Sequence, residues 1–540
     1  MTERLAGIQV QEEAGSGESI AEAPTAVTAF VGRCLRGPVN RPVPISGFNE
    51  FQRIFGGLWQ PSTLSYSVEQ FFENGGRAAI IVRVTNGARC CTVELGAAGR
   101  KLVLEALAPG TREFLRAAVD YDGIGENEDD LFNLVIQRVR TPGSEHIEDQ
   151  EIYRRLSVVP DAPRSVAVVL AVSQLARVAG ELPPLRPDPT PRHDPRGIAG
   201  YVFSGTDADD GAPLTDYDII GSAAQGTGLF ALDAADGFNL LCIPPLAREI
   251  DVGASTLLVA NRFCRERRAL LFVDPPAGWH SAAKAVAEMR HWPLPTDSAC
   301  MFFPRLLGYD KLRGRFEAFA PSGAVAGTLS RASEHWPVWS TACGEDAVLR
   351  PGLRPACTVD NDQRSRLAAA GVNTVQTVRR TGRESPHVCT LAGPGAVAAD
   401  WRSLAARRLA LLIVNSIERG TRWMVFEPNE EATWNRAAQQ VRSFLGMLEE
   451  RGAFAHRKQG DRWFVLCDER INRERLREQG IVNLMFGFPA QRSGGFHAYI
   501  VSHRAGGTRV RTVSPNLAEL PDIGLTQVLA ELDVPAVASV

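Results

Sequence analysis

Apolar residues at the start of the chain change from strand spacing to helical spacing and back. The run AVTAFVG (26–32) predicts a strand, and Phe48, Phe51 and Phe55 then recur at helical spacing. A second helix is expected from Ser62 or Thr63, and RAAIIVRVT (77–85) predicts a buried strand. This β-α-α-β unit lacks partner strands, so we expect them from elsewhere in the chain. Residues 1–25 are polar and Glu/Gly/Ala-rich, which predicts an extended arm outside any core.

The turn Asn74-Gly75-Gly76-Arg77 connects the second helix to the second strand. Glycine-rich turns at this place are either anion-binding loops of α/β enzymes or simple joints. Gly75 is placed to end the helix in a left-handed conformation, and Gly76 lets the chain enter the strand without a side-chain clash. Only Arg77 in this turn could bind a phosphate, so the pattern favours a joint.

The remaining chain divides into three patterns. From about 88 to 195, short apolar runs alternate with acidic and glycine turns, which predicts a small β-rich domain that ends in a stiff, proline-rich connection at 181–197. From 198 to about 370, apolar strands alternate with helical stretches, which indicates βαβ units and a mainly parallel sheet. A further α/β segment follows, with a helix ending near Gly420 and strands expected at 422–428 and 462–468.

Composition narrows the class of protein. A length of 540 residues predicts about three or four domains at roughly 150 residues each. The hydrophobic fraction of 44% and charged fraction of 22% are typical of soluble globular proteins, and a net charge of −3 gives no electrostatic footprint for nucleic acid. No apolar run reaches the roughly 18 residues of a membrane span, and the acidic start does not resemble a signal peptide. We therefore expect a protein made in the cytoplasm.

Cysteine and arginine usage adds two observations. The ten cysteines are dispersed without a CxxC pair, so we expect reduced core cysteines. Only four of the 59 Lys and Arg residues are Lys. A GC-rich genome explains this bias, and so does a need for the planar guanidinium in specific ion pairs; the count fits both.

Enzyme signatures are mostly missing from the sequence. There is no GxSxG, no HExxH and no Gly-Lys pair of a P-loop. Gly226-Thr227-Gly228 lacks the third glycine of a dinucleotide site and is interpreted as a loop. The nine histidines show no family spacing, although a convergent triad assembled in space stays an alternative. The sequence identifies no catalytic, cofactor-binding or metal residue, and we expect no enzyme.

An aspartate-rich stretch, SGTDADDGAPLTDYD (204–218), is the best candidate for a metal site. Its carboxylates are Asp207, Asp209, Asp210, Asp216 and Asp218. An EF-hand loop starting at Asp207 requires glycine at its sixth position, where Ala212 stands. A capped surface turn is the favoured interpretation, and a looser Ca²⁺ site is the alternative.

Several segments together resemble the tail sheath proteins of contractile phage tails and related contractile injection systems. They are PTAVTAFVGRCLRGPVNRPVPISGFNEFQRIFGG (24–57), LSYSVEQFFENGGRAAIIVRV (64–84), GTDADDGAPLTDYDIIG (205–221), LLFVDPP (270–276), PSGAVAGTLSR (321–331) and RRLALLIVNSIERGTRWMVFEPNEEATWNR (407–436). The resemblance spans residues 24 to about 470. The chain departs from the family pattern at PVWSTACGE (337–345) and HVCTLAG (387–393), and the last 30 residues match no family segment.

The resemblance implies a multidomain α/β (α+β) fold. Its expected parts are an N-terminal extended arm (1–25), an N-terminal part of an inner domain (26–88), an inserted β-rich outer domain (89–195), a middle α/β domain of subtilisin-like topology without catalysis (196–369), a C-terminal part of the inner domain (370–510) and a C-terminal extension (511–540). The inner domain is expected to combine the pieces from both chain ends, and the arms to add strands to neighbouring subunits.

The resemblance also implies a function. It suggests a structural subunit that polymerises with itself, as stacked rings, around an inner tube protein, contacts baseplate and terminator proteins, and contracts to drive the tube through a target envelope. No cofactor, direct nucleic-acid contact or membrane insertion is implied, and the place of the protein would be a phage tail or an injection particle assembled in the bacterial cytoplasm. The alternatives are a specialised sheath paralogue or terminator, and a hydrolase on the α/β domain.

Overall fold

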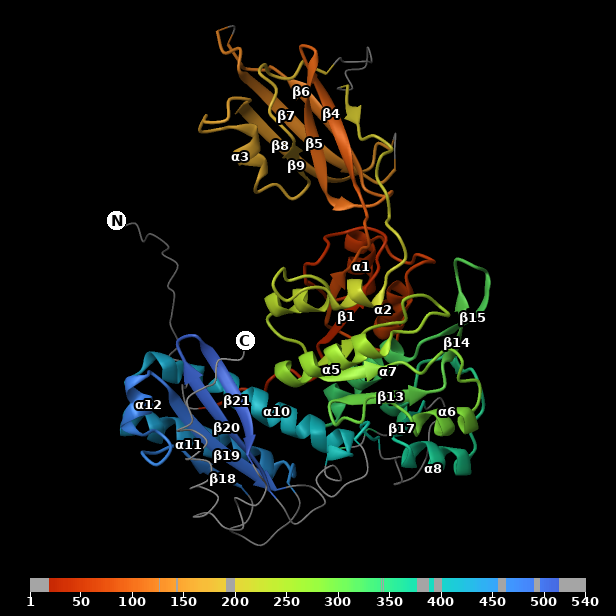
Figure 1. Cartoon of the computed structure of the whole chain (residues 1–540), viewed down its shortest axis with the longest axis vertical. Helices are drawn as coiled ribbons and strands as arrows, with labels where there is room; N and C mark the ends of the chain where they lie inside the picture. The colour runs from red at the N-terminus through yellow and green to blue at the C-terminus, as the bar shows by residue number, and fades with distance from the viewer. Residues whose placement is uncertain are drawn as a thin grey trace, which may run out of the picture. The chain divides into compact units, whose positions relative to one another are not determined.

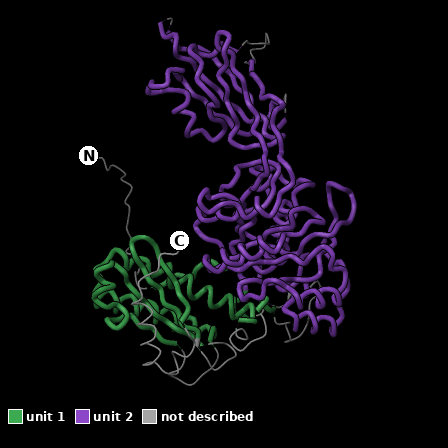
Figure 2. The backbone as a smooth tube through the Cα atoms, viewed as in Figure 1, with its two compact units in different colours: residues 1–25, 336–341, 386–540 green, residues 26–335, 342–385 purple. Residues whose placement is uncertain are grey.

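A computed structural model of the chain contains two compact units (Figure 2). We call residues 26–335 and 342–385 the first unit, which is purple and labelled unit 2 in Figure 2. We call residues 1–25, 336–341 and 386–540 the second unit, which is green and labelled unit 1. The structure describes residues 19–125, 127–141, 144–190, 200–340, 342, 344–375, 388–392, 401–454, 463–489 and 496–513. None of the helices in these ranges is both long and apolar enough to cross a membrane.

A seven-stranded sheet forms the core of the first unit (Figure 1). Its order is β17 (Val372–Thr374), β13 (Ala299–Phe303), β12 (Leu270–Val273), β11 (Leu240–Cys242), β1 (Thr28–Gly32), β3 (Ala79–Arg83) and β2 (Val43–Ile45). All neighbours are parallel except β2, which runs antiparallel to β3 at one edge. The central strands are continuous apolar runs because both faces of the sheet are covered. The parallel sheet predicted from the alternating pattern is therefore confirmed.

The strands from residues 26–88 join this sheet and not the C-terminal segment, which corrects the predicted division of the chain. Strand β1 pairs with β11, with Thr28 opposite Leu240, and on its other side with β3. The sheet also continues beyond residue 369, because β17 adds to β13 after helix α8 (Asn361–Ala369). A strand that is apolar on both faces can pair with any similar strand, so its local sequence does not specify its partner.

Helices and a small second sheet complete this α/β part. The helices are α1 (Phe48–Phe55), α2 (Thr63–Glu73), α4 (Asp216–Ile220), α5 (Ala254–Arg267), α6 (Ala282–Met289), α7 (Ser322–His335) and α8. Short 3₁₀ helices span Gly228–Ala234 (η1) and Gly344–Ala347 (η2). Strands β14 (Leu306–Asp310) and β15 (Arg315–Phe319) form a hairpin that pairs with β16 (Arg354–Pro355).

A β-sandwich is inserted between β3 and the rest of the α/β part. One sheet contains β4 (Cys90–Ala97), β5 (Arg100–Pro109) and β9 (Ala176–Ala179); the other contains β10 (Val202–Phe203), β6 (Phe114–Asp120), β7 (Leu131–Val139) and β8 (Ile147–Ser157), with α3 (Val166–Leu170) beside them. Their inward apolar side chains form one core, as the alternating pattern predicts. Strand β10 carries this part beyond the predicted limit at 195.

The proline-rich connection packs on the sandwich along its described residues, where the sequence predicts a stiff and exposed segment. The Tyr121 hydroxyl donates to the Pro187 carbonyl at 2.6 Å, and the Thr190 amide donates to the Val119 carbonyl at 3.0 Å. The Arg186 guanidinium also lies over the Tyr121 ring. Proline carbonyls still accept hydrogen bonds, and the amides of the residues between the prolines donate them, so both kinds of group attach the segment to the neighbouring sheet.

The second unit packs two long helices on an antiparallel sheet. Helices α10 (Leu404–Gly420) and α11 (Glu431–Glu450) bury their apolar faces against the strands. The sheet runs β18 (Phe464–Leu466), β19 (Val482–Pro489), β20 (Phe496–Arg504) and β21 (Gly507–Val513), with α12 (Glu474–Glu478) between β18 and β19. The strand predicted at 422–428 is wrong: Arg422–Phe426 is a 3₁₀ helix (η3), because Met424 turns into the core directly after α10.

The described end of the N-terminal segment belongs to this second core, so the predicted arm does not extend to residue 25. Ile20 and Ala23 are buried, and the Ala23 amide donates to the Ser416 hydroxyl of α10 at 2.8 Å. A Cβ on Gly420 would lie 2.8 Å from the Ile20 side chain. Two apolar residues in a polar stretch are too weak a pattern to predict this docking. Residues 1–18 of the predicted arm and the extension from 514 onward lie outside the described residues.

Helix α7 approaches α2 closely because two glycines lie in the contact. A Cβ on Gly323 would lie 2.2 Å from the Ser67 carbonyl oxygen, and one on Gly327 would lie 2.2 Å from the Phe71 carbonyl oxygen. Real Cβ atoms are not found at such distances, so any side chain here must push the helices apart. The small residues of the PSGAVAG segment thus set the distance between the two helices.

We expect Gly327→Ala to lower the free energy of unfolding by about 1–3 kcal/mol, because the added methyl overpacks the α2–α7 contact. Gly446→Ala is the matched control. Gly446 lies within α11 and a Cβ there has open space, so helix propensity predicts a gain of up to about 1 kcal/mol. Thermal unfolding of both variants checks this, and equal shifts in the two variants would contradict it.

Candidate functional site

The Asn74–Arg77 turn is a joint, as the sequence analysis favours. Gly75 has a φ of 101°, and the Gly76 amide closes the helix end on the Phe71 carbonyl at 2.9 Å. A Cβ on Gly75 would lie 2.8 Å from Cβ of Arg331 in α7, which leaves no room for a ligand. The Arg331 guanidinium donates to the Asn74 carbonyl at 2.6 Å, and Arg77 forms an ion pair with Glu334. The polar groups of the turn are thus used to attach α2 to α7.

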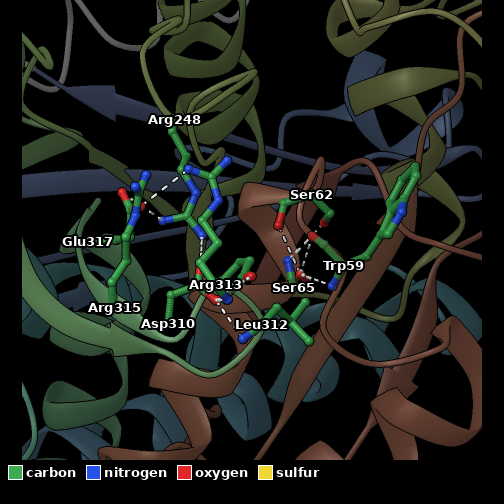
Figure 3. A network of polar contacts seen from close by, with 10 residues as sticks. Trp59, Ser62, Ser65, Arg248, Asp310, Leu312, Arg313, Arg315 and Glu317 are labelled. Atoms are coloured by element: carbon green, nitrogen blue, oxygen red, sulfur yellow. Dashed lines mark hydrogen bonds and ion pairs between the residues drawn. The ribbon is translucent and has the colours of Figure 1, made fainter.

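A buried carboxylate fixes the β14–β15 hairpin (Figure 3). Asp310 has no exposed surface and accepts the Tyr66 hydroxyl at 3.1 Å. It also accepts the backbone amides of Leu312 and Arg313 at 2.9 and 3.2 Å, and it forms an ion pair with Arg248. A carboxylate that receives this many donors holds the hairpin turn in one conformation.

The same network reaches helix α2 through Tyr66 and Arg248. The Arg248 guanidinium lies 4.8 Å from the centroids of the Tyr66 and Phe319 rings and 3.8 Å from the Glu317 carboxylate. Burial, followed by the hydrogen bond to Asp310, raises the pKa of Tyr66 to about 12. At the start of α2, the Ser62 hydroxyl accepts the Ser65 amide at 3.0 Å, which confirms the predicted helix start (Figure 3). The β14–β15 hairpin, the segment that carries Arg248 and helix α2 are therefore connected by one polar and aromatic network.

Two chain segments connect the α/β part to the β-sandwich, and they pair with each other. Arg89 and Asp209 exchange backbone hydrogen bonds of 3.0 and 3.1 Å, and the Ala212 amide donates to the Asn86 carbonyl at 2.8 Å. An Asp-Gly turn follows, and the Arg33 guanidinium donates to the Asp210 and Gly211 carbonyls. We call residues 84–89 and 209–213 the neck.

Arg83 lies at the base of the neck and is only 1% exposed. Its guanidinium donates to the Gly37 carbonyl at 2.6 Å and to the Pro109 carbonyl at 2.7 Å, so it connects the α/β part to strand β5. Burial lowers the pKa of this arginine and raises the pKa of the nearby Glu113 carboxyl. Beside them, Arg36 forms a 2.6 Å ion pair with Glu148 of β8. The connection between the two parts is thus built largely from arginine side chains.

The five aspartates of the aspartate-rich stretch bind separate partners. Asp207 accepts the Thr92 hydroxyl, Asp209 accepts the Gly211 amide, and Asp210 accepts the amide and hydroxyl of Thr111. Asp216 accepts the Gly253 amide and the Thr256 hydroxyl, whereas Asp218 completes a capping box with Thr215 at the start of α4. Across the described ranges, no three His, Cys, Asp or Glu side chains are placed to hold a metal ion. The stretch forms the turns at the neck and at α4.

Gly226-Thr227-Gly228 is a loop, as interpreted from sequence. Thr227 is the N-cap residue of η1, and the Gly228 amide donates to the Asn40 side chain at 2.9 Å. A Cβ on Gly228 would lie 2.7 Å from the backbone of Gly221. This close contact between the start of η1 and the end of α4 explains the glycine at 228.

A serine and a carboxylate meet where α7 begins, which bears on the hydrolase alternative. The Ser322 hydroxyl and amide donate to the Asp274 carboxylate at 2.8 and 2.9 Å. Ser322 is buried and Asp274 is half-buried, and desolvation raises the pKa of Asp274 to about 6. The proton of the Ser322 hydroxyl is used in the hydrogen bond to Asp274. The same carboxylate accepts the amide at the start of α7, so it acts as a cap of this helix.

In the second unit, a buried histidine joins η3 to the β20–β21 hairpin. The Thr421 hydroxyl donates to the Ile417 carbonyl, so it accepts from Nε2 of His503 at 2.8 Å. Nδ1 of His503 lies 2.8 Å from the Thr508 hydroxyl, and it accepts from that hydroxyl when the imidazole is neutral. Burial lowers the pKa of His503 to about 4, in part opposed by Glu418 and reinforced by Arg422.

Three buried ionisable residues were not predicted from the sequence: Arg83, Asp310 and His503. Asp310 precedes the turn Lys311-Leu312-Arg313-Gly314 between two apolar runs, and an Asp before such a turn is a known hairpin signal. Arg83 lies in an otherwise apolar strand. The only signal of its role in the sequence is that a charged residue occurs at this position. Its acceptors, Gly37 and Pro109, are brought to it only by the fold.

The chain, with its parallel α/β core, inserted sandwich and separate helix–sheet unit, is similar to solved structures of sheath tail proteins. No model of a known protein family matches the sequence, and no curated protein matches it either. The comparison with solved structures therefore carries the assignment of the fold.

Solved structures with this fold cover nearly the whole chain. A sheath tail protein from Listeria innocua is 12% identical, with a TM-score of 0.58, and the match covers 90% of this chain and 96% of that chain. A sheath tail protein from Desulfitobacterium hafniense is 13% identical, with a TM-score of 0.50 over 89% and 96% of the two chains. The contracted PVC sheath of an extracellular contractile injection system is 14% identical, with a TM-score of 0.50 over 91% and 96%. The resemblance stated from sequence is confirmed at the level of the fold.

We expect Arg83→Met to lower the free energy of unfolding of the first unit by about 3 kcal/mol or more, because two buried carbonyls lose their charged donor. Limited proteolysis should also cut the neck faster. Arg89→Met is the control, since its side chain is 72% exposed and lies 3.9 Å from Asp209. Denaturant unfolding measures both variants, and an Arg83→Met variant as stable as Arg89→Met would refute the role of Arg83.

The depressed pKa of His503 predicts a stability that depends on pH. Its contribution is complete above the ordinary pKa of 6.5 and is lost as pH falls through the folded value of about 4. Relative to a His503→Gln variant, the wild-type chain should lose about 3 kcal/mol between pH 7 and pH 4. Thermal unfolding of the second unit at both pH values measures the difference, and parallel pH profiles for the two proteins would contradict the assignment.

Proposed function

We propose that this chain is the structural subunit of a contractile sheath, which polymerises around an inner tube and contracts to drive that tube through a target envelope. The observation that carries the proposal is the match of about 90% of the chain to a sheath tail protein. The proposal includes contacts with the tube, a baseplate and a terminator, and assembly in the bacterial cytoplasm into a phage tail or an injection particle.

The second unit supports the proposal because both terminal segments leave from it. Residues 19–25 are anchored on α10, so residues 1–18 begin at this unit. Among the described residues, strand β21 is an edge of its sheet, and it ends at Val513, immediately before the C-terminal segment in the sequence. The other edge strand, β18, has three residues. Edge strands offer unpaired backbone groups that a segment from a neighbouring subunit can bind by β-augmentation.

Strand addition suits a sheath because backbone hydrogen bonds can hold neighbours together while their side-chain contacts rearrange. In the proposed mechanism, subunits assemble in an extended lattice that is kinetically trapped, and a trigger releases a shorter, wider lattice with more interface. If each subunit gains about 5 kcal/mol of interface, which is the scale of a few buried side chains, many subunits together supply the work. The mechanism uses conformational energy stored at assembly and requires no nucleotide.

The proposed strand exchange predicts that deletion of residues 1–18 stops tube formation and leaves folded monomers. The deletion keeps Ile20 and Ala23, so the core of the second unit stays intact. Negative-stain microscopy and sedimentation measure assembly, and circular dichroism with thermal unfolding controls for the fold. Tubes of normal length from the deletion variant would refute the role of this segment.

The function itself has a separate test with the full chain. We expect rings or tubes to form at high protein concentration or when salt is varied. Monodisperse monomers under all salt conditions, together with turnover of a generic ester substrate, would instead favour the hydrolase alternative.

A further inference from the structure

The outer face of the β14–β15 hairpin is apolar and exposed. Tyr309 and Phe316 lie opposite each other in the hairpin and are 55% and 57% exposed. Their rings meet edge to face with centroids 5.7 Å apart. Leu312, in the turn, is 48% exposed. The side chains that alternate with them point to the inner face, where Asp310 and Phe319 are buried, so the fold does not need the outer aromatic pair.

Contacts within the single chain already fix the position of this aromatic face. The Asp310 network attaches the hairpin to α2 and to Arg248, as described above (Figure 3). Lys311 in the turn also forms a 2.8 Å ion pair with Glu69 of α2. A rigid aromatic surface loses little conformational entropy on binding, and exposed Tyr with Arg is typical of residues that dominate the energy of interfaces.

The charge around the aromatic face is positive. Glu317 is shared by Arg248, Arg313 and Arg315 at 3.8, 3.3 and 2.6 Å. Arg354 of β16 lies over the Phe316 ring at 5.1 Å and has no carboxylate partner among the residues that the structure describes. A partner for this surface should therefore combine acidic groups with a contact for the two rings.

The turn between β6 and β7 of the sandwich has the complementary charge. Residues 127–130 supply Glu128, Asp129 and Asp130, and Asp122 lies on the other side of the turn. The Asp129 side chain is 87% exposed, and its ion-pair partner Arg186 is 3.7 Å away. Exposed acids at a β-turn can reach a protruding basic surface on another molecule without a change in either backbone.

We propose that the hairpin face formed by Tyr309, Phe316 and Arg354 docks on the acidic β6–β7 turn of a second copy of this chain. This inference rests on the proposed function, because a sheath requires specific lateral or axial contacts between identical subunits. It adds a side-chain contact between folded domains, separate from strand exchange at the second unit. Such a contact is heterologous, so repeating it builds a ring where the rotation closes and an open helical array where it does not.

The experiment compares the protein concentration needed for assembly, measured by pelleting and negative-stain microscopy. We expect the double variant Tyr309→Ser/Phe316→Ser to raise this concentration about tenfold or more, the effect of losing an interface hot spot. Tyr217→Ser is the matched control, because Tyr217 of α4 is 86% exposed and lies outside the proposed contact. Circular dichroism and thermal unfolding verify that each variant is folded.

A charge exchange tests the identity of the partner. Arg354→Glu and Asp129→Arg should each impair assembly about tenfold, and the chain that carries both should assemble within about threefold of wild type. Normal assembly of the serine double variant, or failure of the charge exchange to restore assembly, would overturn this inference and leave the proposed function intact. Failure of the wild-type chain to assemble would overturn the proposed function and this inference with it.

Discussion

The close packing of α7 on α2 is the contact on which the rest of the first unit depends. Gly323 and Gly327 let the two helix backbones meet, and Arg331 then donates to the carbonyl that ends α2. Helix α7 starts on the Asp274 carboxylate just after β12, so the contact connects this end of the sheet to helix α2. Helix α2 in turn supplies Tyr66, which holds the hairpin through Asp310. If the glycines were larger, each of these connections would have to shift.

Arginine side chains make several of the other contacts between separate segments of the first unit. Arg83 and Arg33 bind backbone carbonyls at the neck, Arg305 donates to the Pro275 and Arg248 carbonyls, and Arg331 binds the Asn74 turn. The planar guanidinium can donate in several directions at once, which a lysine ammonium does less well in a buried site. The scarcity of lysine therefore has a structural use in this fold, although a GC-rich genome would produce the same bias.

Patterns carried by consecutive residues were predictable. Helical spacing identified α1, α2 and α10, apolar runs identified the parallel strands, and the glycines at 75 and 76 identified a joint. The same reasoning failed at Arg422–Phe426, where strand-like composition forms a 3₁₀ helix, because burial of Met424 outweighs local preference. It also failed at Ile20 and Ala23, which dock on a helix almost 400 residues away in sequence.

The sequence by itself determined the class of fold, since periodicity, turn residues and the order of motifs depend only on neighbouring residues. It also indicated that the aspartates at 207–218 form turns, because the spacing of an EF-hand fails at Ala212. The tertiary structure decided which strands share a sheet, which carbonyls Arg83 binds and which side chains the hairpin leaves exposed. These depend on groups that are distant in sequence, and a buried strand or a charged side chain carries no local signal of the partner that the fold will bring to it.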